Sequence, residues 1–337
     1  MNEPTLDDVR AAMPNVYSVM APSPLHRHPL LAEALGADIH VKHENHNPTG
    51  AFKVRGGLNL VARLSQADRA RGVISATTGN HGQSIAFAAA RACVPCTLVV
   101  PLGNNPAKNA LMRAWGADLI EHGKDFDDAR ELVERLCDQR GLRYVHSANE
   151  PDLISGVGTY ALEVFEALAD IDTVFVPIGG GSGACGLITV RDALGLKTRI
   201  VGVGAERADA VAHSWRTGTR IVGTSADTFA EGVATRVTFD LTFGILQRGL
   251  DDFVLLSEEA LAEGVRLALR LTHNLAEGAG AATLAAALKW QDQIAGQRVV
   301  CVMSGGNMDV ARLRAILADH HNHDDTMPRR HDETSNK

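Results

Sequence analysis

One lysine near the N-terminus has a setting suited to covalent chemistry. Lys53 lies between a turn signal and a helical run, in the segment Pro48-Thr49-Gly50-Ala51-Phe52-Lys53-Val54-Arg55-Gly56-Gly57. A lysine amine that is desolvated loses its proton more readily, and the neutral amine is a nucleophile and a base. Most lysines are solvated surface charges. Whether Lys53 is a functional residue therefore depends on three other polar or glycine-rich segments. They are distant in sequence and are suited to complete one pocket with it.

The first of these segments is a glycine-rich loop that follows the apolar run Val174–Pro177. It reads Ile178-Gly179-Gly180-Gly181-Ser182-Gly183-Ala184-Cys185-Gly186 and leads into a helical pattern. Successive glycines let backbone N–H groups turn inward, and the helix start adds positive potential, so the loop predicts a phosphate site. Two cofactor classes fit. Gly181-x-Gly183-x-x-Gly186, with Glu206 after the next strand, also matches the dinucleotide fingerprint of a nicotinamide or flavin enzyme.

The second segment is Thr77-Thr78-Gly79-Asn80-His81, which opens a helical pattern after an apolar run. The first N–H groups of a helix have no partner inside it, and the dipole is positive there, so these N–H groups are suited to a carboxylate. Asn80 offers an amide to a ring oxygen, although asparagine is also a common helix cap.

The third segment is Ser304-Gly305-Gly306-Asn307, which follows the apolar run Val299–Met303. Ser304 is thus predicted at the carboxyl end of a strand, where sites in α/β proteins gather. Taken alone, Ser304 is equally a turn residue. His81, Glu231 and Glu277 are either catalytic residues or ordinary polar residues near a cleft.

Strands and helices must alternate along the chain to position these segments. Short runs rich in β-branched residues are separated by helical stretches such as Gln83–Arg91, Asp125–Arg140, Thr159–Ala169 and Ala260–Leu271. Continuous apolar strands between helices predict parallel sheets covered on both faces, and hence the α/β class. The predicted strands are Ile39–Lys42, Val73–Ala76, Thr97–Val100, Leu119–Glu121, Tyr144–His146, Val174–Pro177, Ile200–Val203, Phe253–Leu256 and Val299–Met303.

Domain boundaries are weakly marked, since no linker interrupts the chain. Residues 75–150 contain a series of strands and helices of their own and are predicted to form a smaller lobe. The polar stretch 319–337 lacks periodicity and is predicted to be a disordered tail.

Composition excludes several classes of function. The chain has 337 residues, 45% hydrophobic and 22% charged, as in a soluble globular protein. A net charge of −7 without basic runs argues against a nucleic-acid partner. No apolar run approaches the roughly 20 residues that cross a membrane. With no visible export signal and five scattered cysteines, we expect a cytoplasmic enzyme with structural thiols.

The four segments together resemble the fold type II pyridoxal-phosphate enzymes, and most closely the serine/threonine dehydratases (threonine ammonia-lyases) and serine racemases. The motifs occur in family order across residues 48–309. The resemblance implies a two-domain architecture similar to the tryptophan synthase β fold. Residues 1–74 and 151–318 would form the large cofactor-binding domain, and residues 75–150 the small domain. It also implies a homodimer.

The resemblance further implies a role for each motif. Lys53 would form the Schiff base with the aldehyde of pyridoxal 5′-phosphate, with Phe52 packed beside the cofactor. Asn80 would bond the 3′-oxygen of the ring, and Ser304 would face the pyridine nitrogen. The phosphate would lie on Gly179, Gly180, Gly181, Ser182 and Gly183. The substrate carboxylate would lie on Thr77, Thr78, Gly79, Asn80 and His81.

This residue set favours loss of a β-hydroxyl. A neutral serine hydroxyl at position 304 would not keep the pyridine nitrogen protonated, which shortens the life of a carbanion and suits elimination. The predicted function is a dehydratase (ammonia-lyase) that converts a small hydroxy amino acid such as L-threonine or L-serine into a 2-oxoacid and ammonia. A hydroxyaspartate, phenylserine and a hydroxylated diamino acid remain open as substrates.

Three positions depart from the family pattern. Ala51 replaces a serine that commonly precedes Phe-Lys, and Thr78 replaces the serine that racemases use as a second base. The divalent-cation site of serine racemases would use Glu206 and an aspartate six residues later, but that position is Ala212. No metal site is predicted. The alternatives are an amino-acid racemase on the same scaffold and a dinucleotide-binding oxidoreductase.

Overall fold

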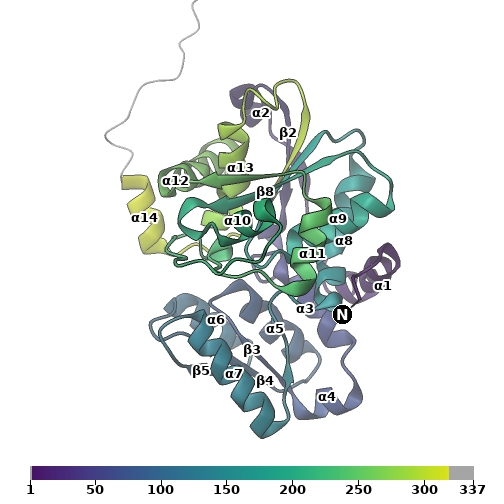
Figure 1. Cartoon of the computed structure of the whole chain (residues 1–337), viewed down its shortest axis with the longest axis vertical. Coiled ribbons are helices and arrows are strands. Elements are labelled where there is room, and N and C mark those ends of the chain that lie inside the picture. Colours follow the sequence, from purple (N-terminus) through teal and green to yellow (C-terminus); the bar gives the residue numbers. More distant parts are fainter. Residues whose placement is uncertain (1, 319–337) are drawn as a thin grey trace, which may run out of the picture.

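The larger of two β-sheets forms the core of one lobe, drawn at the top of Figure 1. The computed structural model describes residues 2–318, so the tail predicted at 319–337 lies outside the described residues. The strand order is β1-β2-β10-β7-β8-β9, with all pairs parallel except β1 against β2. The strands are β1 (Leu25–Arg27), β2 (Asp38–His43), β7 (Thr173–Pro177), β8 (Arg199–Ala205), β9 (Asp252–Leu256) and β10 (Arg298–Met303).

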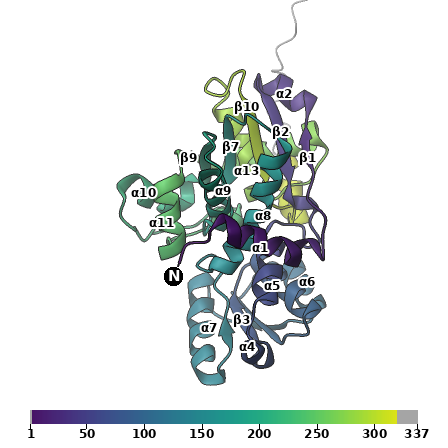
Figure 2. The same cartoon turned by 90° about the vertical axis from the view of Figure 1, so that its right-hand side faces the viewer.

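The smaller sheet forms the other lobe, at the bottom of both views (Figures 1 and 2). Its order is β5-β4-β3-β6, all parallel. The strands are β3 (Val73–Ala76), β4 (Cys96–Val100), β5 (Asp118–Glu121) and β6 (Arg143–Tyr144). The small sheet begins at Val73, two residues before the predicted boundary, and we propose a small domain of about residues 75–150.

Helices cover both sheets. Their bounds are α1 Leu6–Tyr17, α2 Pro29–Leu35, α3 Lys53–Ala62, α4 Gln66–Arg71, α5 Asn80–Arg91, α6 Pro106–Ala114, α7 Phe126–Arg140, α8 Pro151–Ala167, α9 Ser182–Ala193, α10 Ala210–Thr217, α11 Asp240–Gly249, α12 Glu258–Leu267, α13 Gly278–Lys289 and α14 Val310–Ala318. Short helices lie at η1 Glu44–His46, η2 Glu206–Ala208, η3 Glu231–Val233 and η4 Ala268–Thr272.

Successive residues of a central strand face two separate hydrophobic cores. Val174 and Val176 of β7 belong to the core formed with α1, α3, α8 and α9, whereas Phe175 belongs to the core formed with α2, α12 and α13. The period of two residues places alternate side chains on opposite faces, so both faces of the large sheet are buried. The predicted α/β class with covered parallel sheets is confirmed.

All nine predicted strands are present, with ends that differ by up to two residues. The sequence missed β1, because three residues that pair only with β2 in an antiparallel edge carry no periodic signal. It also placed the start of α8 too late: the helix begins at Pro151, because the glycines and serine before Thr159 obscure the helical pattern.

A buried ionic network fixes α3, the helix that begins with Lys53. The Arg55 guanidinium donates to both oxygens of Glu44, at 2.7 and 2.9 Å, and to both oxygens of Glu163, at 2.6 and 3.0 Å. Burial acts to raise the pKa of Glu44, but the charge and hydrogen bonds of Arg55, together with Lys42 and Ser23, hold this pKa below its ordinary value. Lys42 also binds Glu163. The network thus ties α3 to β2 through η1 and to α8.

Candidate active site

The predicted site residues, scattered over 250 positions of sequence, line one cavity of about 420 Å³ between the two lobes. Its walls come from the ends of β3, β7 and β10 and from the starts of α3, α5 and α9. The predicted residues in its lining are Phe52, Lys53, Thr77, Thr78, Gly79, Asn80, His81, Gly179, Gly180, Gly181, Ser182, Gly183 and Ser304. The carboxyl ends of parallel strands therefore gather these segments, as expected for an α/β fold.

Lys53, the first residue of α3, has its amine directed at the glycine loop. Lys53 Nζ donates to Ser182 Oγ at 2.9 Å and to the carbonyl of Ser147 at 3.1 Å. Desolvation lowers the pKa of Lys53 to about 8, and no carboxylate among the described residues lies close enough to raise it. About one tenth of this amine is therefore neutral at pH 7, far more than for a solvated lysine, and nucleophilic attack on an aldehyde requires the neutral form.

The glycine loop has space for an anion and none for side chains. A Cβ on Gly179 would lie 2.3 Å from the carbonyl oxygen of Gly232, and Gly181 has a φ of +93°. Helix α9 begins at Ser182, and its first backbone bond runs from Cys185 N–H to the Gly181 carbonyl at 2.9 Å. The N–H groups before Cys185 thus have no acceptor within the helix, and they form a positive cradle suited to phosphate.

Thr77 organises the start of α5 with its hydroxyl. Thr77 Oγ1 accepts hydrogen bonds from the N–H groups of Gly79, at 3.0 Å, and Gly82, at 2.9 Å. The side chain of Thr77 is therefore engaged in holding the turn. Within the described residues, no acceptor bonds the N–H groups of Thr78, Asn80 and His81, which leaves three donors at a positive helix start.

The amide of Asn80 is oriented by two neighbours on the large lobe. Asn80 Nδ2 donates to Glu277 Oε1 at 2.5 Å, and Asn80 Oδ1 accepts from Asn307 Nδ2 at 2.8 Å. Asn307 Nδ2 also donates to the carbonyl of Thr49 at 2.9 Å. These contacts distinguish the two ends of the amide and leave one N–H of Asn80 for an acceptor in the cavity.

Ser304 and Phe52 are the remaining predicted residues that line the cavity. Ser304 follows β10 and is 5% exposed; its carbonyl accepts from the N–H of Phe52 at 3.0 Å. The Phe52 ring lies edge-on to Tyr160, whose hydroxyl donates to the Gly183 carbonyl at 2.8 Å. Phe52, the N-cap residue of α3, thus packs against the glycine loop at Gly183.

Two histidines near Lys53 are held neutral. Burial, with the Lys53 charge adding to it, lowers the pKa of His81 to about 3 and of His146 to about 4. His81 Nε2 bonds Ser75 Oγ at 2.9 Å, and His146 Nδ1 accepts from the N–H of Asn149 at 2.9 Å. Neither ring contributes a cation to the cavity.

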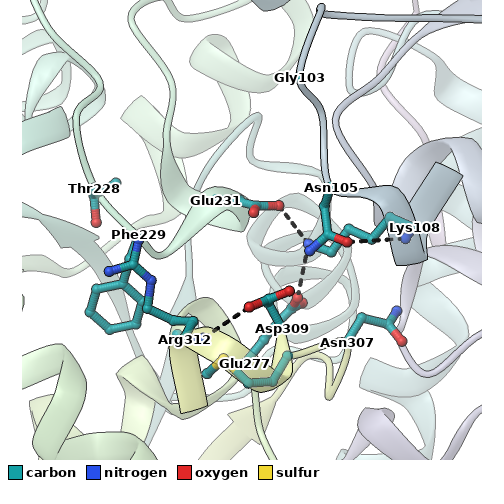
Figure 3. A pocket seen from close by; sticks show the side chains of 12 residues that line it. Gly103, Asn105, Lys108, Thr228, Phe229, Glu231, Glu277, Asn307, Asp309 and Arg312 are labelled. Atoms are coloured by element: carbon teal, nitrogen blue, oxygen red, sulfur yellow. Dashed lines mark hydrogen bonds and ion pairs between the residues drawn. The ribbon is translucent and has the colours of Figure 1, made fainter. Parts of the chain in front are cut away.

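Sequence reasoning missed Lys108, which reaches across from the small lobe (Figure 3). Lys108 Nζ lies 2.5 Å from Glu231 Oε2 and 3.8 Å from Glu277 Oε2. No glycine, turn or strand end marks Lys108 in the sequence, because its importance arises only where the lobes meet. Glu231 and Glu277, left undecided by the sequence, are in the cavity wall.

A family model for "Pyridoxal-phosphate dependent enzyme" matches residues 16–305 of the chain. This match covers all four motifs and most of both lobes. The chain belongs to the pyridoxal-phosphate-dependent enzyme family. Its cofactor is therefore pyridoxal phosphate, and the alternative of a dinucleotide-binding oxidoreductase is not supported.

Known relatives of this pyridoxal-phosphate enzyme are lyases and racemases. It is 36% identical to L-threonine ammonia-lyase of Thermotoga maritima, covering 93% of this chain and 78% of the relative. The structure of the processed threonine deaminase isoform 2 of Solanum lycopersicum matches with a TM-score of 0.86 and 31% identity, over 94% of this chain and 95% of that one. Maize serine racemase matches with a TM-score of 0.88 and 26% identity, over 96% and 100%. The chain is a pyridoxal-phosphate-dependent lyase of the serine/threonine dehydratase type.

The residues that line the cavity have the chemistry that this cofactor requires. A partly neutral lysine lies one hydrogen bond from a glycine cradle that side chains would fill, and an amide donor and a serine hydroxyl line the same space. Among residues 2–318, no group of three or more His, Cys, Asp or Glu side chains is arranged to hold a metal ion. Glu206 instead lies 3.8 Å from Lys289. None of the helices in this range has the length and apolar character that a membrane span needs.

Proposed function

We propose that this enzyme removes the β-hydroxyl of a small hydroxy amino acid, such as L-threonine or L-serine, to yield a 2-oxoacid and ammonia. The observation that carries the proposal is the approach of Lys53 Nζ to the glycine loop at Ser182, in the cavity that also holds Ser304. The identity to L-threonine ammonia-lyase over most of both chains supports the same reaction.

Each residue has a proposed task. Pyridoxal phosphate supplies an electron sink for the electron pair released at Cα. Lys53 would hold the cofactor and, once free, remove the Cα proton, because its lowered pKa leaves more of the amine neutral than in a solvated lysine. The glycine loop would hold the phosphate, and Asn80 would hold the ring through its free N–H. Phe52 would pack beside the ring, and Ser304 would offer the pyridine nitrogen an uncharged partner.

The substrate carboxylate is proposed to lie on the unbonded N–H groups of Thr78, Asn80 and His81. The backbone of Gly79 belongs to the same turn, and Thr77 acts through its hydroxyl, which fixes that turn. The carboxylate would thus be fixed by backbone donors at a helix start, without an arginine. The Cα–H bond can then be presented to Lys53.

The proposal is tested by measuring 2-oxoacid and ammonia from a panel of β-hydroxy amino acids in both configurations. We expect equimolar products from at least one L-amino acid, and loss of at least about 10³-fold of the rate in Lys53→Ala. A protein that binds pyridoxal phosphate but releases neither product from any member would refute the proposal.

Racemisation is the second candidate, because Thr78 lines the same cavity as Lys53 and its hydroxyl could act as a second base. The added methyl group of threonine, compared with serine, crowds that position, so we propose elimination as the main reaction. Incubation of L-serine in heavy water, followed by separation of the enantiomers, measures any D-serine formed.

We further propose a homodimer and a cytoplasmic location. The dimer rests on family resemblance, and light scattering of the purified enzyme tests it. The location rests on the five cysteines, which are free and mostly buried, as in proteins of reducing compartments. Fractionation of the source cells tests the location.

A further inference from the structure

A second cavity of about 300 Å³ adjoins the cofactor cavity, and Figure 3 shows the side chains that line it. The two cavities share the lining residues Gly103, Asn105, Lys108, Thr228, Glu231 and Glu277. Serine and threonine carry at most one methyl group beyond the reacting carbons. The second cavity therefore offers far more room than either side chain uses, and it borders the cofactor cavity at Lys108.

The charges at the junction are mostly negative. Lys108 is the cation there, and it is shared between Glu231 and Glu277. Burial raises the pKa of Glu277. Burial alone would lower the pKa of Lys108, but the charges of Glu277 and Glu231 outweigh it, so the pKa of Lys108 is raised. Glu231 has a side chain that is 43% exposed and binds Lys108 through Oε2, so Oε1 is left for another donor.

The outer wall adds a further carboxylate. Asp309 accepts a hydrogen bond from the backbone N–H of Arg312 at 2.9 Å. The Arg312 side chain is exposed, and its guanidinium lies over the Phe229 ring at 5.7 Å from the centroid. Figure 3 shows this guanidinium at Phe229, away from Lys108. The cavity lining thus contains three carboxylates and two cations. Lys108 is paired with Glu231 and Glu277, and Arg312 lies over Phe229.

We propose that this second cavity binds the end of the substrate side chain, and that the preferred substrate is a β-hydroxy amino acid whose side chain ends in an ammonium group. This inference rests on the function proposed above and specifies its substrate class. Glu231 accepts a hydrogen bond from the substrate ammonium, and the charge of Asp309 adds negative potential around it. A side-chain carboxylate would instead meet three like charges, and both cations of the lining are already engaged, Lys108 with two carboxylates and Arg312 with the Phe229 ring.

The chemistry at the reacting carbons is the same for such a substrate. Loss of the Cα proton and the β-hydroxyl releases one water molecule, and hydrolysis of the resulting imine consumes one water and releases ammonia. The side-chain ammonium is unchanged and keeps its charge throughout. The second cavity therefore acts on recognition and not on bond breaking.

Three β-hydroxy amino acids of matched length test the charge preference. They are 3-hydroxy-2,4-diaminobutyrate (ammonium), 3-hydroxyasparagine (amide) and 3-hydroxyaspartate (carboxylate), each assayed for 2-oxoacid with the wild-type holoenzyme. We expect kcat/KM to fall in that order, with at least about a tenfold preference for ammonium over amide, as for one hydrogen bond to a charged group. A preference for the amide or the carboxylate overturns the inference.

The variant Glu231→Gln identifies the carboxylate responsible. It should reduce the ratio of kcat/KM between the ammonium and amide substrates by about tenfold. The matched control is Glu166→Gln, which removes an exposed carboxylate of α8 outside both cavities and should leave this ratio unchanged. An unchanged ratio in Glu231→Gln overturns the role of Glu231.

The two proposals fail in different ways. If L-threonine or L-serine yields 2-oxoacid while the three probes show no order by charge, only the substrate class is wrong. If the loaded enzyme yields no 2-oxoacid from any of these compounds, the dehydratase function itself is wrong.

Discussion

At the scale of single residues, desolvation governs the reactivity of Lys53. With a pKa of about 8, the neutral fraction of Lys53 rises from about one tenth at pH 7 to about nine tenths at pH 9. We therefore predict that the cofactor-free enzyme binds pyridoxal phosphate covalently about tenfold faster at pH 9 than at pH 7, with a plateau above pH 9. Stopped-flow absorbance measures this rate. A rate that keeps rising beyond pH 10 would show an ordinary, solvated lysine.

Asn307 acts on the cofactor through Asn80. In Asn307→Ala the Asn80 amide loses the donor that orients it, so we predict about tenfold weaker binding of pyridoxal phosphate and a shifted absorbance band of the bound cofactor. Fluorescence titration and the visible spectrum measure both. Asn45→Ala is the control, since Asn45 bonds the Leu275 carbonyl outside the cavity. Equal spectra for Asn307→Ala and the wild type would exclude this positioning role.

At the scale of elements, α3 depends on the ion pairs of Arg55. In Arg55→Met, Glu44 remains buried without its partner, so we predict that the free energy of unfolding falls by about 3–5 kcal/mol. At the C-cap of this helix, Arg63 binds Asp152 at 2.6 Å with a side chain 44% exposed, so Arg63→Met should cost at most about 1 kcal/mol. Urea denaturation measures both losses. Similar losses in the two variants would mean that burial of the network is unimportant.

The elements also explain what the sequence could predict. The Thr77 segment, the Gly179 loop and Ser304 directly follow apolar runs, and parallel strands bring such strand ends together, which predicts one site for them. The resemblance to the pyridoxal-phosphate enzymes adds Lys53 to that site. Lys108 was missed, because it lies inside helix α6 of the other lobe and meets Glu231 only through tertiary packing. The cap role of Thr77 was missed for the same reason, since it depends on the backbone path of the turn.

At the scale of the whole molecule, buried neutral histidines make the fold sensitive to acid. Burial lowers the pKa of His43 and His81 to about 3 and that of His146 to about 4, against about 6.5 in the unfolded chain. Below pH 6.5 the unfolded state binds more protons, so stability falls as pH falls toward 4. Each histidine contributes a slope of at most about 1.4 kcal/mol per pH unit.

Urea denaturation between pH 7 and pH 5 measures this acid sensitivity. We predict that His43→Phe makes the slope of unfolding free energy against pH shallower, whereas His213→Gln, at an exposed site, does not. Stability that stays constant or rises on acidification to pH 5 would contradict the burial of these neutral rings.

The central claim is that Lys53 carries the cofactor in this cavity. Borohydride reduction of the loaded enzyme makes the link between cofactor and lysine permanent, and mass spectrometry of the digested protein locates the label. We predict the pyridoxyl label on the peptide that contains Lys53, and no label there in Lys53→Ala. A label on another lysine, or none at all in an enzyme that has bound pyridoxal phosphate, would contradict the account.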